Sequence, residues 1–572
     1  MSLRVYILVA FSSAKGINHL LLIVRKHTMP DEDEEKEKVV PSTITLSKVT
    51  NNLLHAFRSI KQKSPTDEFT KLSVSQTVSF IALMYEKVRN AIEYREDHLI
   101  RRAAIERILK RRLSLNPEGK NESENILREL MWARYFPNGS LGELDIQDIQ
   151  RIIDRYIDIR KQLLPGRTQK IRSYLSEFLL QLITAEIEEF LNPADSQQEA
   201  DFGYYIFQTL KDKVKIEDVD TQKKDTYLYI AIEKSYRKSD QAYQRYHLFR
   251  LFYNQLIAYS ADEIQNLIPK FSDIFQKIDD LISNPTVEKL VRFTRKQLPP
   301  FLILFSLFRE NKSDIESVIS KKSTLWSHVE KIARQKYADI RSRLNILAFR
   351  SLVYIFITKM LLALMLEVPI SEYFYHEVNY WAIGINSLVP PLFMLFIILS
   401  VTVPGEENTK RLFFRIVEII DADSTFEKST ALITKRAKNR RPLLAIGFSL
   451  LYVTTFIVTL YLIHIGLKML NFNILSEAIF IFFISVVAFF AYRIKQLANM
   501  YRLTEKGSFF SPVFDFFFMP ILSMGKLFSE GVSRLNFFIV LFDFIIEAPF
   551  KLIIEVIEEW ITFVRQKKED IV

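Results

Sequence analysis

The 572-residue chain contains no cysteine. This absence excludes disulfide bonds, thiolate nucleophiles, cysteine-held iron–sulfur clusters and cysteine-rich zinc sites. His and carboxylate side chains remain as possible metal ligands, but no grouping of them predicts a metal site, and no motif predicts a cofactor. Glycine is also scarce, at 13 residues, and the alternation typical of strands between turn signals is hard to find. We therefore expect an all-α fold.

Motifs of common enzyme classes are missing as well. No P-loop, dinucleotide fingerprint or nucleophile elbow occurs. Asp201-Phe202-Gly203 spells the metal-binding tripeptide of protein kinases, but the other kinase motifs do not accompany it. His376-Glu377 lacks the second His that a zinc-protease helix needs, because Tyr380 stands there. The sequence therefore predicts no catalytic residues and no enzyme.

The overall composition, 49% hydrophobic and 25% charged, averages over two different halves. Residues 41–345 carry most of the charge in helical patterns, which predicts a cytosolic α-helical domain of many helices. Residues 346–505 contain long apolar runs and predict a transmembrane region, and residues 506–572 predict an amphipathic, membrane-associated tail. Much of the net charge of +10 lies beside the apolar runs, where it sets membrane orientation. Binding to nucleic acid is therefore not expected.

The first 40 residues predict a disordered segment. The apolar stretch 6–11 is too short for a signal peptide, and polar residues follow it. A second possibility is that translation begins at Met29, which precedes the charged run Pro30–Lys38.

Four segments approach the roughly 20 apolar residues that a spanning helix needs. They predict a four-helix transmembrane bundle with spans at about 352–368, 381–403, 443–467 and 474–492. The second span contains the double proline Pro390-Pro391.

Charges in the connecting loops predict the direction of these spans. Lys and Arg collect before the first span, in the loop 404–441 and after the last span, whereas the hairpin 369–380 contains neither. Because Lys and Arg favour the cytoplasmic side, both termini should be cytoplasmic, in a multi-pass protein of the plasma (cell) membrane. The basic residues before the first span are Lys331, Arg334, Lys336, Arg341, Arg343 and Arg350.

Ionisable residues inside the apolar runs are the candidate site. A charge at mid-bilayer costs about 2.5 to 3.5 kcal/mol on insertion scales, so Lys359, Glu367, His464 and Glu477 each need a partner or a purpose. One interpretation is a proton- or cation-responsive cluster, which His376 and Glu377 could join. The other is structural: residues at helix ends reach water while Lys359 pairs with a neighbouring helix.

The soluble half predicts about eight to ten helices between Leu46 and Phe349, the longest over Ser75–Leu113. Its basic end should complement the helix dipole and stay solvated, although anionic lipid, RNA or an acidic helix could also bind it. The tyrosine-rich stretch 227–256 is expected to be core. Breaks are predicted at Asn116-Pro117, Pro165-Gly166, Asn192-Pro193, Asn284-Pro285 and Pro299-Pro300.

The tail 508–564 is too apolar for an ordinary surface, yet no run in it is long enough to cross a bilayer. Asp543, Glu547, Lys551 and Glu555 recur every four residues and form one mainly acidic stripe on a helix. We hypothesise that this stripe meets the basic segment 331–350 beneath the bundle.

The function expected from these features is non-catalytic. The cytosolic domain would bind or position an unknown protein partner at the lipid bilayer, and homo-oligomers are possible. The alternative is a transporter or channel component that uses the ionisable residues of the spans. An intramembrane enzyme is a weaker third possibility, since no nucleophile and base can be named.

Overall fold

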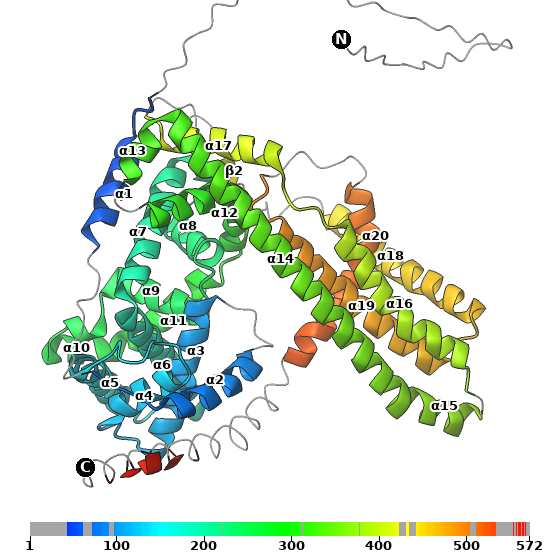
Figure 1. Cartoon of the computed structure of the whole chain (residues 1–572), viewed down its shortest axis with the longest axis horizontal. Coiled ribbons are helices and arrows are strands. Elements are labelled where there is room, and N and C mark those ends of the chain that lie inside the picture. Colours follow the sequence, from blue (N-terminus) through cyan, green and yellow to red (C-terminus); the bar gives the residue numbers. More distant parts are fainter. Residues whose placement is uncertain are drawn as a thin grey trace, which may run out of the picture. The chain divides into compact units, whose positions relative to one another are not determined.

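The computed structural model describes residues 43–60, 71–90, 96–217, 219–311, 314–376, 378–422, 431–433, 442–503 and 511–533, with single positions between 553 and 567. α-Helices dominate these residues, so the all-α prediction is confirmed (Figure 1). The predictions for the first 40 residues, including a start at Met29, lie outside the described residues.

Thirteen α-helices among the described residues precede the apolar runs, more than the eight to ten that the sequence predicted. A short parallel pair of strands, β1 (Val214–Ile216) and β2 (Ala431–Ile433), accompanies them. The helices are α1 (Lys48–Ser59), α2 (Gln76–Asn90), α3 (Asp97–Leu115), α4 (Glu122–Trp132), α5 (Glu143–Leu163), α6 (Gln169–Leu191), α7 (Pro193–Leu210), α8 (Thr221–Ser235), α9 (Gln241–Tyr253), α10 (Ala261–Leu267), α11 (Phe271–Ile282), α12 (Pro285–Glu310) and α13 (Ile315–Ser320).

Most predicted helix breaks are confirmed, and one is wrong. Helix α3 ends before Asn116, the break at Pro165-Gly166 separates α5 from α6, and α7 and α12 each begin at the proline of an Asn-Pro pair. Pro299-Pro300 does not end a helix but lies inside α12. The double proline removes two backbone donors, yet both prolines and the following Phe301 are buried, so packing holds the helix together.

The predicted long helix over Ser75–Leu113 is also wrong. The structure has two helices there, α2 and α3, and Glu96 before α3 has an extended backbone with φ −68° and ψ 152°. An extended residue cannot continue a helix, so the hydrophobic period alone missed this boundary.

The core of this helical domain is rich in aromatic rings. Phe57 of α1 meets Phe308 of α12 edge to face with ring centroids 5.3 Å apart, and Phe178 stacks on Phe275 at 3.8 Å. Tyr243 and Tyr246 of the tyrosine-rich stretch are almost fully buried. The structure thus places these tyrosines in the core, as expected.

Helix α17 (Glu406–Ile420) comes from the loop between the second and third apolar runs but belongs to the same core. Leu412 and Ile416 are fully buried in it. The backbone of Ser47 donates to Ile420 O at 2.8 Å, and Ala422 N donates to Thr45 O at 2.8 Å. The loop 404–441 therefore supplies part of the helical domain.

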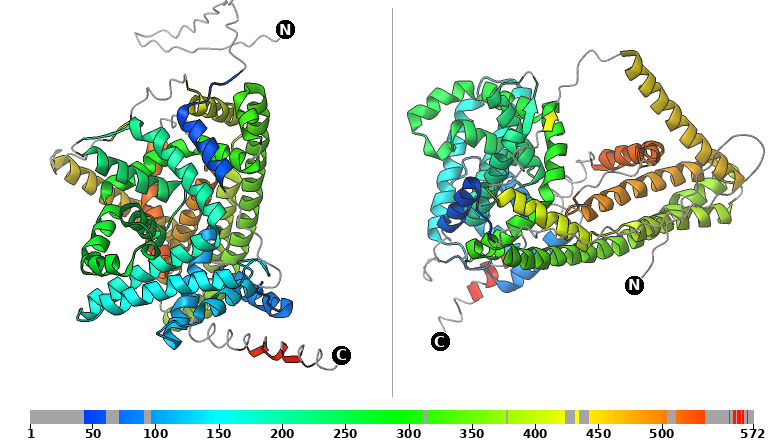
Figure 2. Two further views of the ribbon diagram at one scale, coloured as in Figure 1. Left: turned by 90° about the vertical axis from the view of Figure 1, so that its left-hand side faces the viewer. Right: turned by 90° about the horizontal axis from the view of Figure 1, so that it is seen from above.

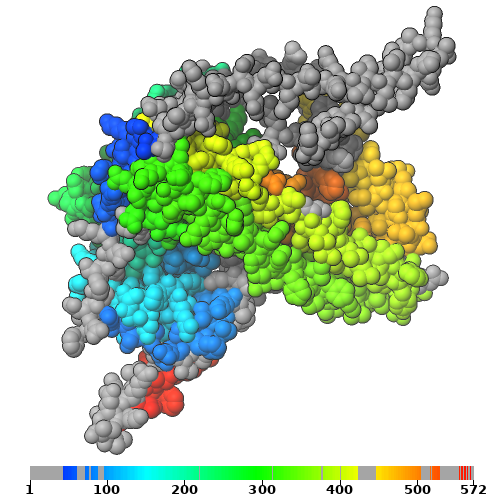
Figure 3. All heavy atoms as spheres, turned by 45° about the horizontal axis from the view of Figure 1, so that its top comes forward, coloured from blue at the N-terminus to red at the C-terminus, as the bar shows by residue number. Residues whose placement is uncertain are grey.

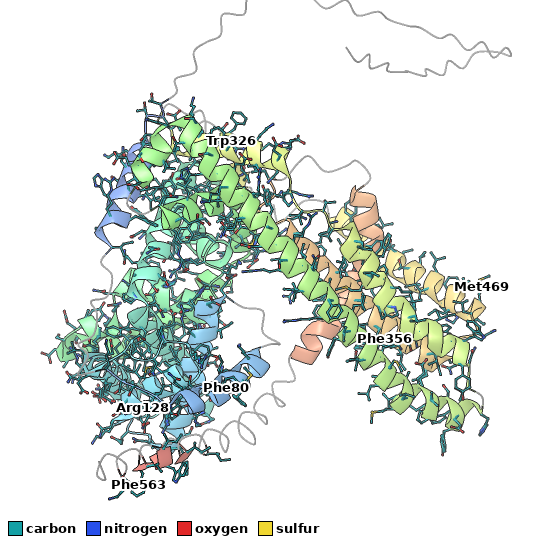
Figure 4. The ribbon with its side chains drawn as sticks, in the orientation of Figure 1. Phe80, Arg128, Trp326, Phe356, Met469 and Phe563 are labelled. Carbon is teal, nitrogen blue, oxygen red and sulfur yellow. The ribbon has the colours of Figure 1, made fainter. Side chains whose placement is uncertain are left out.

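Helix α14 (Lys322–Leu362) runs without a break from the helical domain into the apolar helices. Leu325 and Val329 near its start are buried in the core of the domain, whereas Ile340 and Ile355 belong to a second apolar cluster. Trp326 and Phe356, labelled in Figure 4, mark these two parts. The expected boundary at 345/346 thus falls inside one helix.

The apolar helices follow. A π-helical turn, Ala363–Glu367, joins α14 to α15 (Val368–Tyr375), after which come α16 (Tyr380–Ser400), α18 (Pro442–Met469), α19 (Ile474–Ala498) and α20 (Ser511–Ser533). We call α14 from Ile340 onward, α15, α16, α18, α19 and α20 the apolar bundle. Helix α16 packs against α14 and α19, and α20 packs against α19 (Figure 2).

Four helices among the described residues are long and apolar enough to cross a membrane: Lys322–Phe374, Tyr380–Leu399, Ile446–Met469 and Ile474–Ala498. They overlap all four predicted spans, although the second helix ends at Leu399 and the third begins at Ile446, inside the predicted ranges 381–403 and 443–467. Asn379 Nδ2 donates to Asn471 O at 3.0 Å, and Asn473 Nδ2 donates to Ser371 Oγ at 3.0 Å. The two hairpins therefore meet at one end of the apolar bundle.

Helix α20 approaches α19 closely at Gly525, which faces the backbone carbonyl of Ser485. In the tail, Ile557 and Ile561 pack against the core of the helical domain. The acidic stripe 543–555 and its proposed contact with residues 331–350 lie outside the described residues.

Candidate functional site

Lys359 and Glu367 form an ion pair in the interior of the apolar bundle. Lys359 Nζ lies 3.7 Å from Glu367 Oε2, and both side chains are 0% exposed. The π-helical turn lies between them along the chain, and Glu367 is its last residue. Such turns occur frequently at functional sites. The sequence predicted both residues, and the structure brings them together.

Asn386 of α16 completes this buried group, and sequence analysis missed it. Its Nδ2 donates to Glu367 Oε1 at 2.8 Å and to the backbone O of Ser476 at 3.2 Å. An uncharged amide drew no attention in the sequence, although an Asn within an apolar run was a usable signal. We call Lys359, Glu367 and Asn386 the bundle triad.

Three polar atoms of the bundle triad are buried without a hydrogen-bond partner among the described residues: Lys359 Nζ, Glu367 Oε2 and Asn386 Oδ1. Lys359 Nζ also lies 4.9 Å from the ring centroid of Phe483, a cation–π contact that offsets part of its desolvation. Polar atoms without hydrogen bonds in an apolar interior cost free energy, so these three atoms are the part of the bundle triad that a further polar group would stabilise.

His464 and Glu477 form a second pair. The two Glu477 carboxylate oxygens lie 2.7 and 2.8 Å from His464 Nδ1. His376 is exposed at the end of α15, where φ is 54°, and Glu377 lies outside the described residues. The structure thus joins the four predicted residues as two pairs and leaves His376 in neither.

The arginines at the basic end of α3 are largely buried, which corrects the expectation that this end is solvated, and only Lys110 among its basic residues is exposed. Arg102 is only 5% exposed and donates to Glu106 and Asp240 at 2.7 and 2.8 Å. Arg112 pairs at 2.8 Å with Glu129, a fully buried residue of α4. These arginines therefore hold neighbouring helices together, because buried carboxylates elsewhere in the domain need cationic partners.

The helical domain also contains a buried network around His247. Its Nε2 lies 2.8 Å from Glu189 Oε1 and its Nδ1 lies 2.7 Å from Glu233 Oε2. Arg237 pairs with the same two carboxylates at 3.4 and 3.5 Å. Two carboxylate acceptors require a proton on each ring nitrogen, so His247 is an imidazolium. We call these four residues the His247 network.

Charge pairing sets the pKa values in the His247 network. Burial opposes a charge on His247, but Glu233 and Glu189 outweigh it and raise its pKa. Burial would likewise raise the pKa of Glu189, yet His247 and Arg237 lower it to about 2. The network is therefore two cations and two anions that stabilise each other.

A cavity of about 870 Å³ adjoins this network. Helices α5 to α9 and the segment after α9 form it, and its floor includes Glu186, which burial gives a pKa raised to about 7. Sequence analysis missed this cavity because its lining comes from residues more than 100 positions apart. We call it the domain cavity.

No protein family model matches the chain, and no curated protein sequence or solved structure is similar to it.

Proposed function

We propose that the chain is a multi-pass protein of the plasma membrane, with both termini in the cytoplasm, whose helical domain binds and positions a partner at the bilayer without catalysis. The exposed apolar surface of α18 is the main support for the membrane location. Its apolar side chains point outward along its length, from Ile446, 67% exposed, to Met469, 80% exposed. In water this surface would be a large aggregation-prone patch, whereas hydrocarbon solvates it.

The arrangement of the connections supports the orientation. The two hairpins lie together at one end of the apolar bundle, and α17, between the second and third candidate spans, lies in the core of the helical domain. Exposed basic residues such as Arg334 and Arg341 follow the domain part of α14. Lys and Arg favour the cytoplasmic side, so the helical domain belongs there.

Helix α14 supports the positioning role. One unbroken helix is buried first in the domain core and then in the apolar bundle, and α16 lies along it in the space-filling view (Figure 3). A continuous helix transmits orientation, which a flexible linker does not. Such a continuous connection is what positioning a partner at the bilayer requires.

The absence of cysteine makes the topology directly testable. Single cysteines at His376 and Leu470 should react with a membrane-impermeant maleimide in intact cells. Single cysteines at Lys331 and Glu406 should react only after permeabilisation. Labelling in the reverse pattern would overturn the orientation, and equal labelling of all four sites would overturn the membrane assignment.

The positioning role is tested by breaking α14 between its two buried parts. Ala338 is exposed, so Ala338→Pro removes no core contact but kinks the helix. Lys322→Pro, at the first residue of the same helix, is the matched control because proline is tolerated there. In a host that depends on the protein, A338P should lose function while protein level stays normal. Retained function would refute the positioning role.

A transport or channel role is the second candidate, and the bundle triad favours it. A buried charge pair with unpaired donor and acceptor atoms is a common feature of ion and proton pathways. The triple variant K359M/E367L/N386L removes all its polar groups with little change in volume. Transport requires loss of function in this variant, whereas the positioning role requires that function survive it.

A further inference from the structure

The domain cavity has one buried carboxylate that forms no ion pair with a described cation, although Arg250 attracts it from a distance. Glu186 is 3% exposed and lines the cavity. Its Oε2 accepts the Tyr156 hydroxyl at 2.6 Å, and its Oε1 accepts no hydrogen bond from the described residues. The guanidinium groups of Arg237 and Arg250 pair instead with Glu189, at 3.4 and 2.9 Å.

Glu186 is therefore unlike the other carboxylates around it. Glu189 and Glu233 are paired inside the His247 network, and Asp148 pairs with Arg151 at the rim. Burying a carboxylate without a charged partner costs free energy. In protein interiors such a group is neutralised by protonation or by a bound cation.

The walls of the cavity are mainly apolar. Above the floor they include Ile152, Phe190 and Ile257, and the rim includes Leu251, which is 54% exposed. Tyr229 adds an aromatic ring, whose face favours a cationic group. At about 870 Å³, the cavity is of the size that small organic ligands occupy.

We propose that the domain cavity binds a small organic amine, whose ammonium group pairs with Glu186 Oε1 and whose apolar body lies against the walls. The ammonium supplies the cation that the floor lacks. An anionic ligand would meet Glu186 and Glu189 unfavourably, and its natural partners Arg237 and Arg250 are already paired. This site does not depend on the proposed membrane role.

Binding of an amine is coupled to the ionisation of Glu186. Its pKa is raised to about 7, chiefly by burial, so the carboxylate form falls roughly tenfold between pH 8 and pH 6. Affinity for an amine should fall by the same factor. Other titratable or charged groups also line the cavity or face Glu186, namely Tyr156, Asp148, Arg151, Glu189, Tyr229, Arg237, Tyr246, His247 and Arg250.

The test uses the purified full chain and three amine–alcohol pairs of matched size: hexylamine with hexanol, phenethylamine with phenethyl alcohol, and tryptamine with tryptophol. Indole-3-propionate is the anionic probe. Ligand-observed NMR and equilibrium dialysis measure binding. At pH 8 we expect at least one amine to bind about tenfold tighter than its alcohol, and indole-3-propionate to bind no better than tryptophol.

Variants assign the binding to this cavity. Glu186→Gln keeps the size and the acceptor for Tyr156, and it should reduce amine affinity to that of the alcohol and remove the pH dependence. Glu118→Gln, an exposed carboxylate paired with Lys161, is the control and should change nothing. Leu251→Trp, at the exposed rim, should weaken amine and alcohol alike without disturbing the floor.

Several results would overturn the proposal. These are no binding of any amine at millimolar concentration, equal binding of amines and alcohols, or full affinity in E186Q. A pH dependence that persists in E186Q would assign the titration to His247 and overturn the role of Glu186.

Discussion

The His247 network of the helical domain and the bundle triad of the apolar bundle both bury charged side chains, but they satisfy them differently. In the His247 network two cations and two carboxylates contact each other, and none of its side-chain atoms is among the buried, unpaired atoms of the described residues. In the bundle triad three polar atoms have no hydrogen-bond partner among the described residues, and the ion pair between two of them is long, at 3.7 Å. A network whose polar atoms are all hydrogen-bonded fixes the packing of its helices. A buried polar group with missing hydrogen bonds in an apolar interior is a candidate site for binding or transporting an ion or a proton.

The first prediction breaks the complete network and has the largest effect. Arg237→Met removes the cation that pairs with Glu189, Glu233 and the nearby Glu199. We therefore expect a loss of about 3 to 5 kcal/mol in the free energy of unfolding. Thermal unfolding of the full chain in detergent measures it. Arg58→Met, which removes an exposed pair with Glu316, should cost less than about 1 kcal/mol. Equal shifts for both variants would show that the network does not stabilise the fold.

The second prediction addresses the bundle triad. Lys359→Met leaves Glu367 buried without its cation and should destabilise the fold by about 3 kcal/mol, as expected for a broken buried pair. The double variant K359M/E367L should recover most of this loss, as the charge disappears. Thermal unfolding midpoints of the single and double variants, compared with that of the natural chain, test this prediction. A double variant no better than the single one would show that the pair itself stabilises the bundle.

The third prediction concerns the contribution of Glu186 to the stability of the fold. Its pKa is about 7 in the folded chain against 4.5 ordinarily, so the folded state holds the proton more tightly than the unfolded state. The resulting stability is present below about pH 4.5 and is lost as the pH rises through 7, which amounts to about 3 kcal/mol. Glu186→Gln should therefore unfold at a higher temperature than the natural chain at pH 8 and at a similar temperature at pH 5. A variant that is less stable at pH 8 would contradict this.

The smallest effect is expected at the contact of α19 and α20. A Cβ on Gly525 would lie 2.8 Å from Phe489 Cβ, so Gly525→Val should force the two helices apart at a cost of about 1 to 3 kcal/mol. Faster trypsin cleavage after Lys526 would report this loosening. Gly447→Val is the control, since a Cβ there meets no atom within 4 Å. Identical cleavage rates would show that the close approach is dispensable.

The sequence predicted features that depend on local pattern. Long apolar runs gave the four candidate spans, and Asn-Pro pairs gave helix starts such as those of α7 and α12. It could not show that Pro299-Pro300 continues a helix, because tertiary packing overrides the propensity of proline there. Nor could it pair Arg101 with Glu188, which lies 87 positions away.

The candidate sites divide in the same way. Lys359, Glu367, His464 and Glu477 were visible because a charge in an apolar run is conspicuous. Their pairing was not visible, since it depends on which helix faces which. Glu186 carried no signal at all, because a Glu on an amphipathic helix looks like a surface residue until the other segments around the domain cavity enclose it.

The place of α17 in the core has a consequence for biosynthesis. Leu412 and Ile416 leave the ribosome after the first two apolar helices, yet they fill the core that residues 43–333 begin. A nascent chain of 345 residues therefore lacks these core side chains, and in the proposed topology the domain can complete its core only after the second apolar helix has returned the chain to the cytoplasmic side. Under the proposed topology, insertion of the first hairpin precedes the final folding of the domain, and an error in insertion would leave the helical domain incomplete and open to proteases.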